Sequence, residues 1–285
     1  MAERPPQVLT MSDIRLIALD LDGTLLDNNK NLSERNRSAL SRAAEKGIYI
    51  VMSTGRFYTG MPQQIRDLPF VNYVITINGA CVLDVAESEE IYQANIPNDE
   101  ALKLMRELDG FDCVYDCYQD SWGWMSADQH ARCQEYTDDV HYQKMLKELR
   151  SPVPDLKKRL QENGQDVQKI QFFTRDFDFK NEVLNNWGTR YPDLLFSTSQ
   201  INNVEINNRN ANKGDAMIAL SYHLGIRKNE TMAFGDGLND LTMIKKAGIG
   251  VAMKNSDEKV KNAADIVTDT NDKDGVAKII EEYCL

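Results

Sequence analysis

The sequence predicts an α/β protein with two parts, a parallel β-sheet covered by helices and an α+β domain inserted into it. Three observations support this prediction. Short apolar runs alternate with helical patterns near both ends of the chain, as in a parallel sheet buried on both faces. Residues 86–207 have strand-like runs that mix apolar and polar residues, and they contain all three tryptophans. Several apolar runs stop at acidic, hydroxyl or glycine residues, where parallel sheets bind their ligands.

The first part of the sheet is expected from apolar runs with little polar interruption. Ser33 is the expected N-cap of a helix that ends at Gly47, and a second helix lies within residues 58–68. Strands and helices therefore alternate with short connections, which is typical of parallel strands joined by crossovers. The expected strands are residues 16–19, 48–52 and 73–77.

The same pattern returns after the insertion, so the sheet domain is expected to be split into residues 13–85 and 208–285. Ser256 is the expected N-cap of the third helix of this second half. The expected strands here are residues 231–234, 249–252 and 266–267. The expected helices are residues 214–224, 238–247, 256–264 and 274–283.

The inserted segment, residues 86–207, is expected to be an α+β domain with a largely antiparallel sheet, because its strand-like runs are mixed rather than wholly apolar. Those runs include residues 90–96, 168–174 and 194–198. Helical patterns lie between them at residues 98–108, 132–149, 155–163 and 179–187.

Composition limits the possible partners and location. The net charge of −11 argues against a nucleic-acid-binding surface and against anionic membranes. No apolar run has transmembrane length. Residues 1–12 lack the apolar core of a signal peptide and are expected to be a disordered extension, with Met11 as an alternative start. Five cysteines without an export signal favour reduced thiols and a cytoplasmic location.

Two aspartates follow the first strand directly, at the edge where such sheets bind ligands. Asp20 and Asp22 are two residues apart, so they point to the same side while the strand lasts and repel each other unless a cation joins them. One carboxylate could attack a phosphoryl group while the other moves protons. The alternative, an acidic turn without function, is less favoured because the later strands end in matching groups.

Two of those groups suit phosphate binding. Thr54 and Gly55 follow the second strand and offer a hydroxyl and a free backbone N–H. Lys213 precedes a helix and offers a cation that can neutralise a bound phosphoryl group. Each alone could be an ordinary turn or a solvated lysine.

The last of these groups is Gly-Asp-Gly-Leu-Asn-Asp at residues 235–240. Asp236 and Asp240 provide hard oxygen ligands of the kind that Mg²⁺ prefers, and Asn239 can donate to phosphate. Asp240 could also simply complement the positive end of a helix.

With these four motifs the chain resembles the haloacid dehalogenase superfamily of phosphatases, in particular its Cof-type, sugar-phosphatase-like group. The resemblance covers essentially the whole chain after residue 12 and implies a Rossmann-like core with an inserted cap. The matching motifs are residues 20–24, 53–56, 213–214 and 235–240.

The resemblance also implies roles. Asp20 would be the nucleophile and Asp22 the general acid and base. Mg²⁺ would be held by Asp20, the backbone carbonyl of Asp22 and Asp236, with Asp240 in support. Phosphate would be bound by Leu21, Thr54, Gly55, Lys213 and Asn239, helped by the backbone N–H of Asp22. Gly237 stands where some relatives supply a further metal contact. Arg56 and Asn78 would touch the substrate or hold the cap hinge.

The inserted domain should govern substrate choice and water exclusion. Its candidate lining residues, which could equally be ordinary packing, are Tyr115, Tyr118, Trp122, Trp124 and His130. A scattered set of possible metal ligands fits no zinc signature; it comprises Cys113, Cys117, His130 and Cys133. Asp138 and Asp139 are expected to be a solvated face.

The expected function is Mg²⁺-dependent hydrolysis of a small phosphorylated metabolite, such as a sugar phosphate, through an aspartyl-phosphate. A phosphotransferase or phosphomutase that returns the phosphate to a sugar remains open. So does a phosphate-binding regulator without turnover, which would be expected to lack Asp22 or Lys213. The physiological substrate and the oligomeric state are not predicted.

Overall fold

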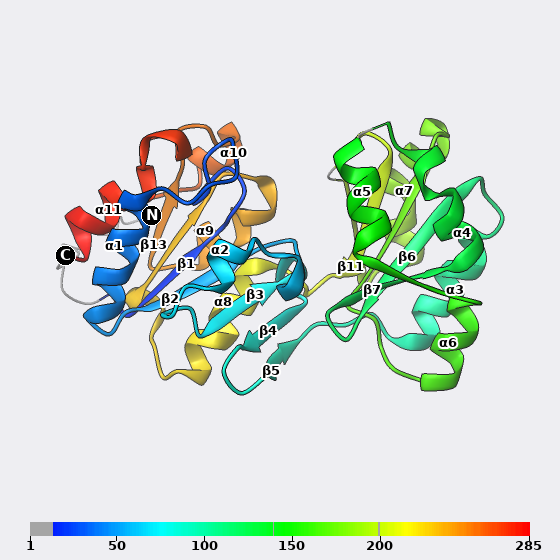
Figure 1. The fold of residues 1–285 in the computed structure, drawn as a ribbon, viewed down its shortest axis with the longest axis horizontal. Coiled ribbons are helices and arrows are strands. Elements are labelled where there is room, and N and C mark those ends of the chain that lie inside the picture. Colours follow the sequence, from blue (N-terminus) through cyan, green and yellow to red (C-terminus); the bar gives the residue numbers. More distant parts are fainter. Residues whose placement is uncertain (1–13, 139, 199) are drawn as a thin grey trace, which may run out of the picture.

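The computed structural model describes residues 14–138, 140–198 and 200–285 and contains two β-sheets (Figure 1). One sheet has eight strands in the order β14-β13-β12-β1-β2-β3-β4-β5, and the other has six in the order β10-β11-β9-β6-β7-β8. We call the first sheet with its helices the core and the second with its helices the cap. The extension expected at residues 1–12 lies outside the described residues.

The first segment of the core contains most of the elements expected there. Ser33 accepts a hydrogen bond from the Asn36 N–H and caps α1, and Gly47 follows the helix with φ +83°. The helix expected within residues 58–68 is a 3₁₀ turn followed by a short α-helix. The elements are β1 Leu16–Leu19, α1 Glu34–Glu45, β2 Tyr49–Ser53, η1 Tyr58–Gly60, α2 Gln63–Arg66, β3 Tyr73–Thr76, η2 Ile77–Gly79, β4 Cys81–Asp84 and β5 Glu89–Gln93.

The second segment of the core also follows the expected order. The predicted cap of α10 was wrong, because Asp257 accepts from the Lys259 N–H while the Ser256 hydroxyl donates to the Gly235 carbonyl. The elements are α8 Lys213–His223, η4 Lys228–Glu230, β12 Thr231–Gly235, η5 Leu238–Asp240, α9 Leu241–Lys246, β13 Ile249–Ala252, α10 Glu258–Lys261, β14 Ile266–Val267, η6 Asn271–Lys273 and α11 Gly275–Tyr283.

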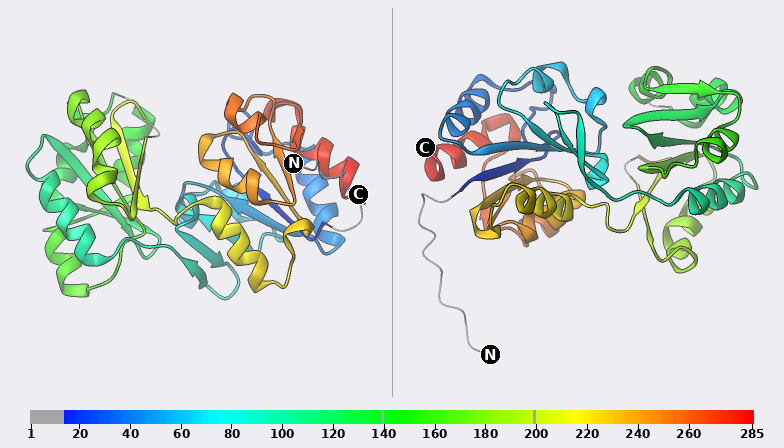
Figure 2. Two further views of the ribbon diagram at one scale, coloured as in Figure 1. Left: turned by 180° about the vertical axis from the view of Figure 1, so that it is seen from behind. Right: turned by 90° about the horizontal axis from the view of Figure 1, so that it is seen from below.

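The core sheet joins segments that are far apart in the sequence. β1 lies between β2 and β12 in parallel register, with Ala18 paired to both Val51 and Ala233. Helices cover both faces (Figure 2), because α1 and α11 pack on one side and α8 and α9 on the other. This arrangement confirms the predicted α/β class and explains the uninterrupted apolar strands.

The edge of the core sheet differs from the prediction. β4 and β5 are antiparallel additions beyond β3. The strand expected at residues 90–96 therefore belongs, as β5, to the core sheet, although residues 86–207 were assigned to the insertion. A strand with mixed polarity fits this place because an edge position is half solvated.

The cap is built on a mainly antiparallel sheet, in which β7 and β8 form the one parallel pair among the described strands. The single helix expected at residues 132–149 is interrupted and forms parts of α4, η3 and α5. The elements are α3 Asn98–Leu108, β6 Cys113–Gln119, β7 Trp122–Ser126, α4 Ala127–Arg132, η3 Cys133–Tyr136, α5 Val140–Glu148, β8 Arg150–Val153, α6 Leu156–Asn163, β9 Lys169–Thr174, α7 Phe177–Arg190, β10 Leu194–Ser197 and β11 Asn203–Asn208.

Two chain segments link the core and the cap (Figure 2), residues 94–97 after β5 and residues 209–212 before α8. The two parts also pack together at a small apolar cluster that includes Phe57 of the core and Tyr118 of the cap. Within the described part of the chain, no helix combines the length and apolar character that a membrane span requires.

Candidate active site

The four motifs meet at the carboxyl ends of the parallel core strands. Asp20 follows β1, Thr54 follows β2, Asp236 follows β12, and Lys213 begins the neighbouring helix α8. The Lys213 Nζ lies 2.5 Å from Asp20 Oδ1 and 2.6 Å from Asp240 Oδ1, and the lysine side chain is fully buried. The convergence of these motifs, which the sequence predicts, is present in the structure.

Asp240 is held on both of its carboxylate oxygens. Its Oδ1 accepts from Lys213, and its Oδ2 accepts from the backbone N–H groups of Asp236 and Gly237 at 2.9 Å each. This geometry fits a residue that positions Lys213 and the turn after β12. Both carboxylate oxygens of Asp240 are therefore already used by donors of the protein.

A second turn brings Asp236 against the first motif. The Thr24 hydroxyl donates to Asp236 Oδ1 at 2.7 Å, which leaves Oδ2 for another partner. Gly23 has φ +88°, and a Cβ atom there would collide with the Asp236 carboxylate. Glycine is therefore needed both for the backbone conformation and for the close approach of the two loops.

Three carboxylates share this site with one lysine. Asp20, Asp236 and Asp240 each offer an oxygen within 4.8 Å of the others. Burial, followed by the charge of Asp240, raises the pKa of Asp20 to about 8, and burial raises the pKa of Asp236 to about 6. Burial opposes the charge on Lys213, but Asp20 and Asp240 outweigh it and raise the pKa of the lysine. Hard oxygen donors with excess negative charge fit a divalent cation such as Mg²⁺.

The carboxylate of Asp22 turns away from this cluster. It accepts from Arg56 Nε at 3.1 Å and Nη2 at 3.0 Å, and it lies 2.9 Å from Lys30 Nζ. Burial would raise the pKa of Asp22, but the hydrogen bond from Lys30 and the charge of Arg56 lower it below its usual value. The aspartate is therefore ionised and ion-paired, and Lys30 is a partner that the sequence did not indicate.

The phosphate-binding candidates of the core are linked through Asn78. The Asn78 N–H donates to the Thr54 carbonyl at 3.0 Å, and its Oδ1 accepts from Asn239 Nδ2 at 3.3 Å. The Asn78 side chain also lies against Gly55, where a Cβ atom would come within 2.9 Å of its Oδ1. Asn78 thus joins the second and fourth motifs, whereas Leu21 contributes a buried side chain and its backbone.

Two of the five cap candidates reach the core. The ring centroids of Tyr118 and Trp122 each lie 5.4 Å from that of Phe57, the residue after Arg56. Tyr115 instead donates to Asp109 at 2.7 Å, and Trp124 has Arg159 above its ring at 3.8 Å. These two belong to the sheet face covered by α3 and α6 and do not face the core.

The other cap residues that the sequence suggested as substrate or metal contacts do not come together at one site. His130 lies in α4, where the Lys147 ammonium donates to its backbone carbonyl. Cys117 packs with the cluster of α3 and α6, and the partly buried Cys113 packs against the same cluster, whereas Cys133 packs on the opposite face of the sheet with η3 and α5. Asp138 is exposed and pairs with Arg175; Asp139 lies outside the described residues.

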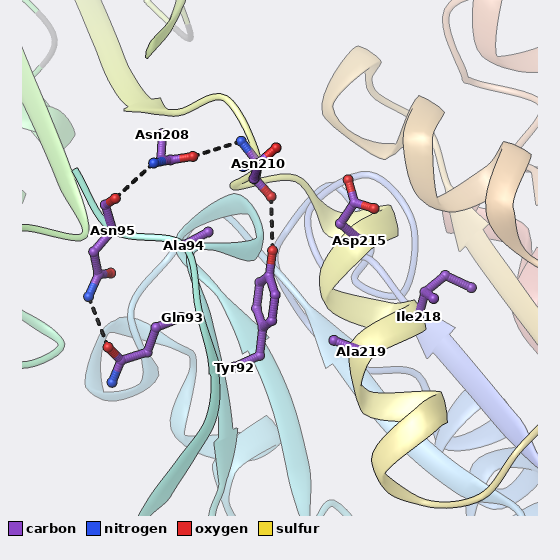
Figure 3. A pocket seen from close by; sticks show the side chains of 9 residues that line it. All are labelled: Tyr92, Gln93, Ala94, Asn95, Asn208, Asn210, Asp215, Ile218 and Ala219. Atoms are coloured by element: carbon purple, nitrogen blue, oxygen red, sulfur yellow. Dashed lines mark hydrogen bonds between the residues drawn. The ribbon is translucent and has the colours of Figure 1, made fainter. Parts of the chain in front are cut away.

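A separate depression lies at the linkers (Figure 3), with a volume of about 600 Å³. The Tyr92 hydroxyl points to the Asn210 carbonyl at 3.2 Å, and Asn208 Nδ2 donates to the Asn95 carbonyl at 2.8 Å. These bonds tie the linker at Asn210 to β5 and the linker at Asn95 to β11. The lining contains none of the residues of the four motifs; it consists of Tyr92, Gln93, Ala94, Asn95, Asn208, Asn210, Asp215, Ile218 and Ala219.

With this geometry in place, the chain belongs to the haloacid dehalogenase-like hydrolases, whose family model matches residues 17–280. It is 32% identical over 273 residues to 5-amino-6-(5-phospho-D-ribitylamino)uracil phosphatase YcsE of Bacillus subtilis, covering 96% of this chain and 97% of that protein. It is also 32% identical over 292 residues to Phosphatase YwpJ of the same organism, covering 94% and 99%.

The fold agrees with this assignment. A haloacid dehalogenase-like hydrolase from Bacteroides thetaiotaomicron is 29% identical, with a TM-score of 0.78 over 94% of this chain and 99% of that one. A second such hydrolase, from B. subtilis, is 31% identical with a TM-score of 0.75 over 94% and 99%. The protein is therefore a phosphoric monoester hydrolase of this family, and the predicted family and fold are confirmed.

Proposed function

We propose that the protein is a Mg²⁺-dependent phosphatase of small phosphorylated metabolites, sugar phosphates in particular, and that it acts through an aspartyl-phosphate on Asp20. The observation that carries the proposal is the buried Lys213 between Asp20 and Asp240. Lys213 places a cation beside Asp20, the carboxylate that would attack. Both lie at the carboxyl edge of the core sheet, where the other motifs offer hydrogen-bond donors for a phosphate group. A cytoplasmic location is part of the proposal and is supported by five free cysteines.

The reaction would run in two transfers. An oxygen of Asp20 attacks the phosphorus while the bond to the leaving oxygen breaks, and Asp22 gives its proton to that oxygen. Water then attacks the phosphorus, Asp22 takes the proton of the water, and the bond to Asp20 breaks. This sequence restores the carboxylate and releases inorganic phosphate. Before the first transfer Asp22 must leave one of its two cations and take up a proton from water, since Lys30 and Arg56 both favour its ionised form.

The bound phosphate would be held by Thr54, Gly55, Asn239 and Lys213, together with the backbone N–H groups of Leu21 and Asp22. Mg²⁺ would be held by Asp20, Asp236 and the backbone carbonyl of Asp22, with Asp240 in support, and would offset negative charge on the phosphoryl group. Gly237 contributes its N–H to Asp240, so we do not assign it to the metal.

The proposed substrate class rests on the name of a relative. A relative at 32% identity is named as a phosphatase of a phosphoribitylamino-uracil, in which a polyol chain carries the phosphate. We propose that this protein also acts on small phosphorylated polyhydroxyl compounds. A phosphomutase remains the second candidate, since Asp20 and Asp22 would serve it equally well.

Purified protein incubated with Mg²⁺ and a panel of sugar phosphates, polyol phosphates and p-nitrophenyl phosphate tests this function. Free phosphate is measured with malachite green, and ³¹P NMR follows the phosphate esters. We expect the signal of inorganic phosphate to grow at the expense of the substrate. A new ester signal without free phosphate would instead indicate a mutase, and no change across the panel would refute the proposal.

A further inference from the structure

One face of the cap sheet changes in character along the strands. At one end, apolar side chains of β6, β7 and β9 pack under η3 and α5, including Val114, Met125 and Phe173. Towards the other end the same face carries buried polar and charged side chains, although apolar side chains could fill this space equally well. These residues, each at most 7% exposed, are Asp116, Tyr118, Arg150, Lys169, Gln171 and Glu205.

The first half of this polar set is a buried ion pair beside an aromatic ring. Lys169 Nζ lies 2.9 Å from Glu205 Oε2, and it also lies 5.1 Å from the centre of the Tyr118 ring. β6 and β9 place Tyr118 directly opposite Lys169, and β9 and β11 place Gln171 opposite Glu205. Neighbouring strands therefore bring the pair together on one face of the sheet.

The second half of the polar set is another buried ion pair, formed by Arg150 and Asp116. The Arg150 Nη2 donates to the Tyr118 hydroxyl at 2.8 Å, and its Nε lies 2.9 Å from Asp116 Oδ2. Gly123 leaves the room that this side chain needs, because a Cβ atom there would collide with the Arg150 side chain. Asp116 Oδ1 and Gln171 Oε1 are buried acceptors without a hydrogen-bond partner in the described structure. Such acceptors are uncommon and call for a donor.

The polar set reaches the phosphate-binding motifs of the core. Asn78 Nδ2 donates to Glu205 Oε2 at 3.5 Å, and the other end of the same amide accepts from Asn239. Tyr118 packs on Phe57, which directly follows Arg56, the partner of Asp22. The group that would protonate the leaving oxygen and the group that would bind the phosphate both lie next to this face of the cap.

We propose that Lys169 and Glu205 form the subsite for the leaving group and select an uncharged polyhydroxyl one. This inference rests on the function proposed above. A buried ion pair offers little for packing that apolar side chains would not provide, because both charges lose their hydration. An ammonium with three donors beside a carboxylate that only accepts suits hydroxyl groups, which both donate and accept.

The charge balance of the subsite sets its selectivity. Lys169 and Arg150 are matched by Glu205 and Asp116, so within the described residues of this polar set no cation is left over for a second phosphate or a carboxylate on the substrate. Because the pair is nearly buried between core and cap, the substrate enters when the two parts separate and is enclosed when they close.

The test compares substrates within each variant. Lys169→Met and Glu205→Gln are assayed on ribitol 5-phosphate and on p-nitrophenyl phosphate, whose leaving group has no hydroxyl chain. We expect the ratio of kcat/KM for the polyol phosphate to that for the nitrophenyl compound to fall at least tenfold, mainly through KM. Lys180→Met is the matched control, because Lys180 is a buried cap lysine that donates to the carbonyls of Gln200 and Ile201. Its ratio should not change.

Several results would overturn the inference. Unchanged ratios in both variants, or an equal fall in Lys180→Met, would remove the subsite. A wild-type preference for a sugar bisphosphate over the monophosphate would contradict the charge balance. Glu205→Gln preserves the size of the side chain, so the test stands if Lys169→Met does not fold. If the wild-type protein released phosphate from neither substrate, the proposed function would fail instead.

Discussion

The core and the cap both bury lysines among carboxylates, but the charge balance differs. In the core, Lys213 faces Asp20, Asp236 and Asp240, so negative charge is in excess at the strand ends. On the polar face of the cap sheet, the buried Lys169 and Arg150 are each matched by one carboxylate. Unbalanced buried charge is costly until a charged ligand completes it, whereas a balanced set is suited to a neutral one. We propose that this difference separates the place of phosphate chemistry, in the core, from the place of substrate choice, in the cap.

The two regions also obtain their side chains in different ways. The core assembles its site from residues that follow separate parallel strands, so each lies on a loop or at a helix start. The cap uses alternate residues within antiparallel strands, for example Lys169 and Gln171 of β9. Loop positions let residues approach a ligand from several sides, whereas strand positions present a flat face.

The largest effect is expected from Asp20→Asn, because the amide cannot act as the attacking carboxylate. Phosphate release from p-nitrophenyl phosphate should fall by about 10⁴-fold. Asp67→Asn, an exposed aspartate of the core, serves as the control and should retain wild-type rates. Retained turnover in Asp20→Asn would move the nucleophile elsewhere and break the assignment of chemistry to the core.

Removal of metal should come next in size. Treatment with EDTA should lower phosphate release by about 10³-fold, since three clustered carboxylates repel the phosphate when no divalent cation offsets them. Adding excess Mg²⁺ should restore the rate. Rates that are indifferent to chelation would show that Lys213 alone balances the core site.

Lys213→Met should lower the rate by about 10²-fold. It should also lower the free energy of unfolding by about 3–5 kcal/mol, because Asp20 and Asp240 lose their buried cation. Lys246→Met provides the contrast, since its pair with Asp215 is 41% exposed on both side chains and is expected to contribute only about 0–1 kcal/mol. Urea unfolding of both variants measures the difference, and equal losses would contradict the importance of burial.

The smallest effect concerns the contact between the two regions. Phe57→Ala and Trp122→Ala each remove one side of an aromatic contact that docks the cap on the core. We expect each to change kcat/KM for a polyol phosphate by a few fold. The double variant should lose less than the sum, with a coupling of about 0.5–1.5 kcal/mol. Strict additivity would mean that the rings do not act together in closing the site.

Much of the core could be predicted because its signals are local. Apolar runs identify buried strands, and Asp20, Thr54 and Asp236 follow those runs directly. The cap was harder to predict, because its strands mix apolar and polar residues and therefore give a weaker pattern along the sequence. The interruption of the helix expected at 132–149 and the membership of β5 in the core sheet depend on packing that no short window of sequence contains.

The sequence by itself determined the fold class, the four motifs and their order, because these depend on residue type and on neighbours a few positions away. Only the tertiary structure decided that Asp22 turns to Lys30 and Arg56, that Asp240 orients Lys213, and that Asn78 joins the core to Glu205 of the cap. The physical reason is distance along the chain. Apart from Asp22 and Lys30, which are 8 positions apart, these contacts join residues 27 to 127 positions apart. They depend on strand register and loop closure, which are settled only when the whole chain packs.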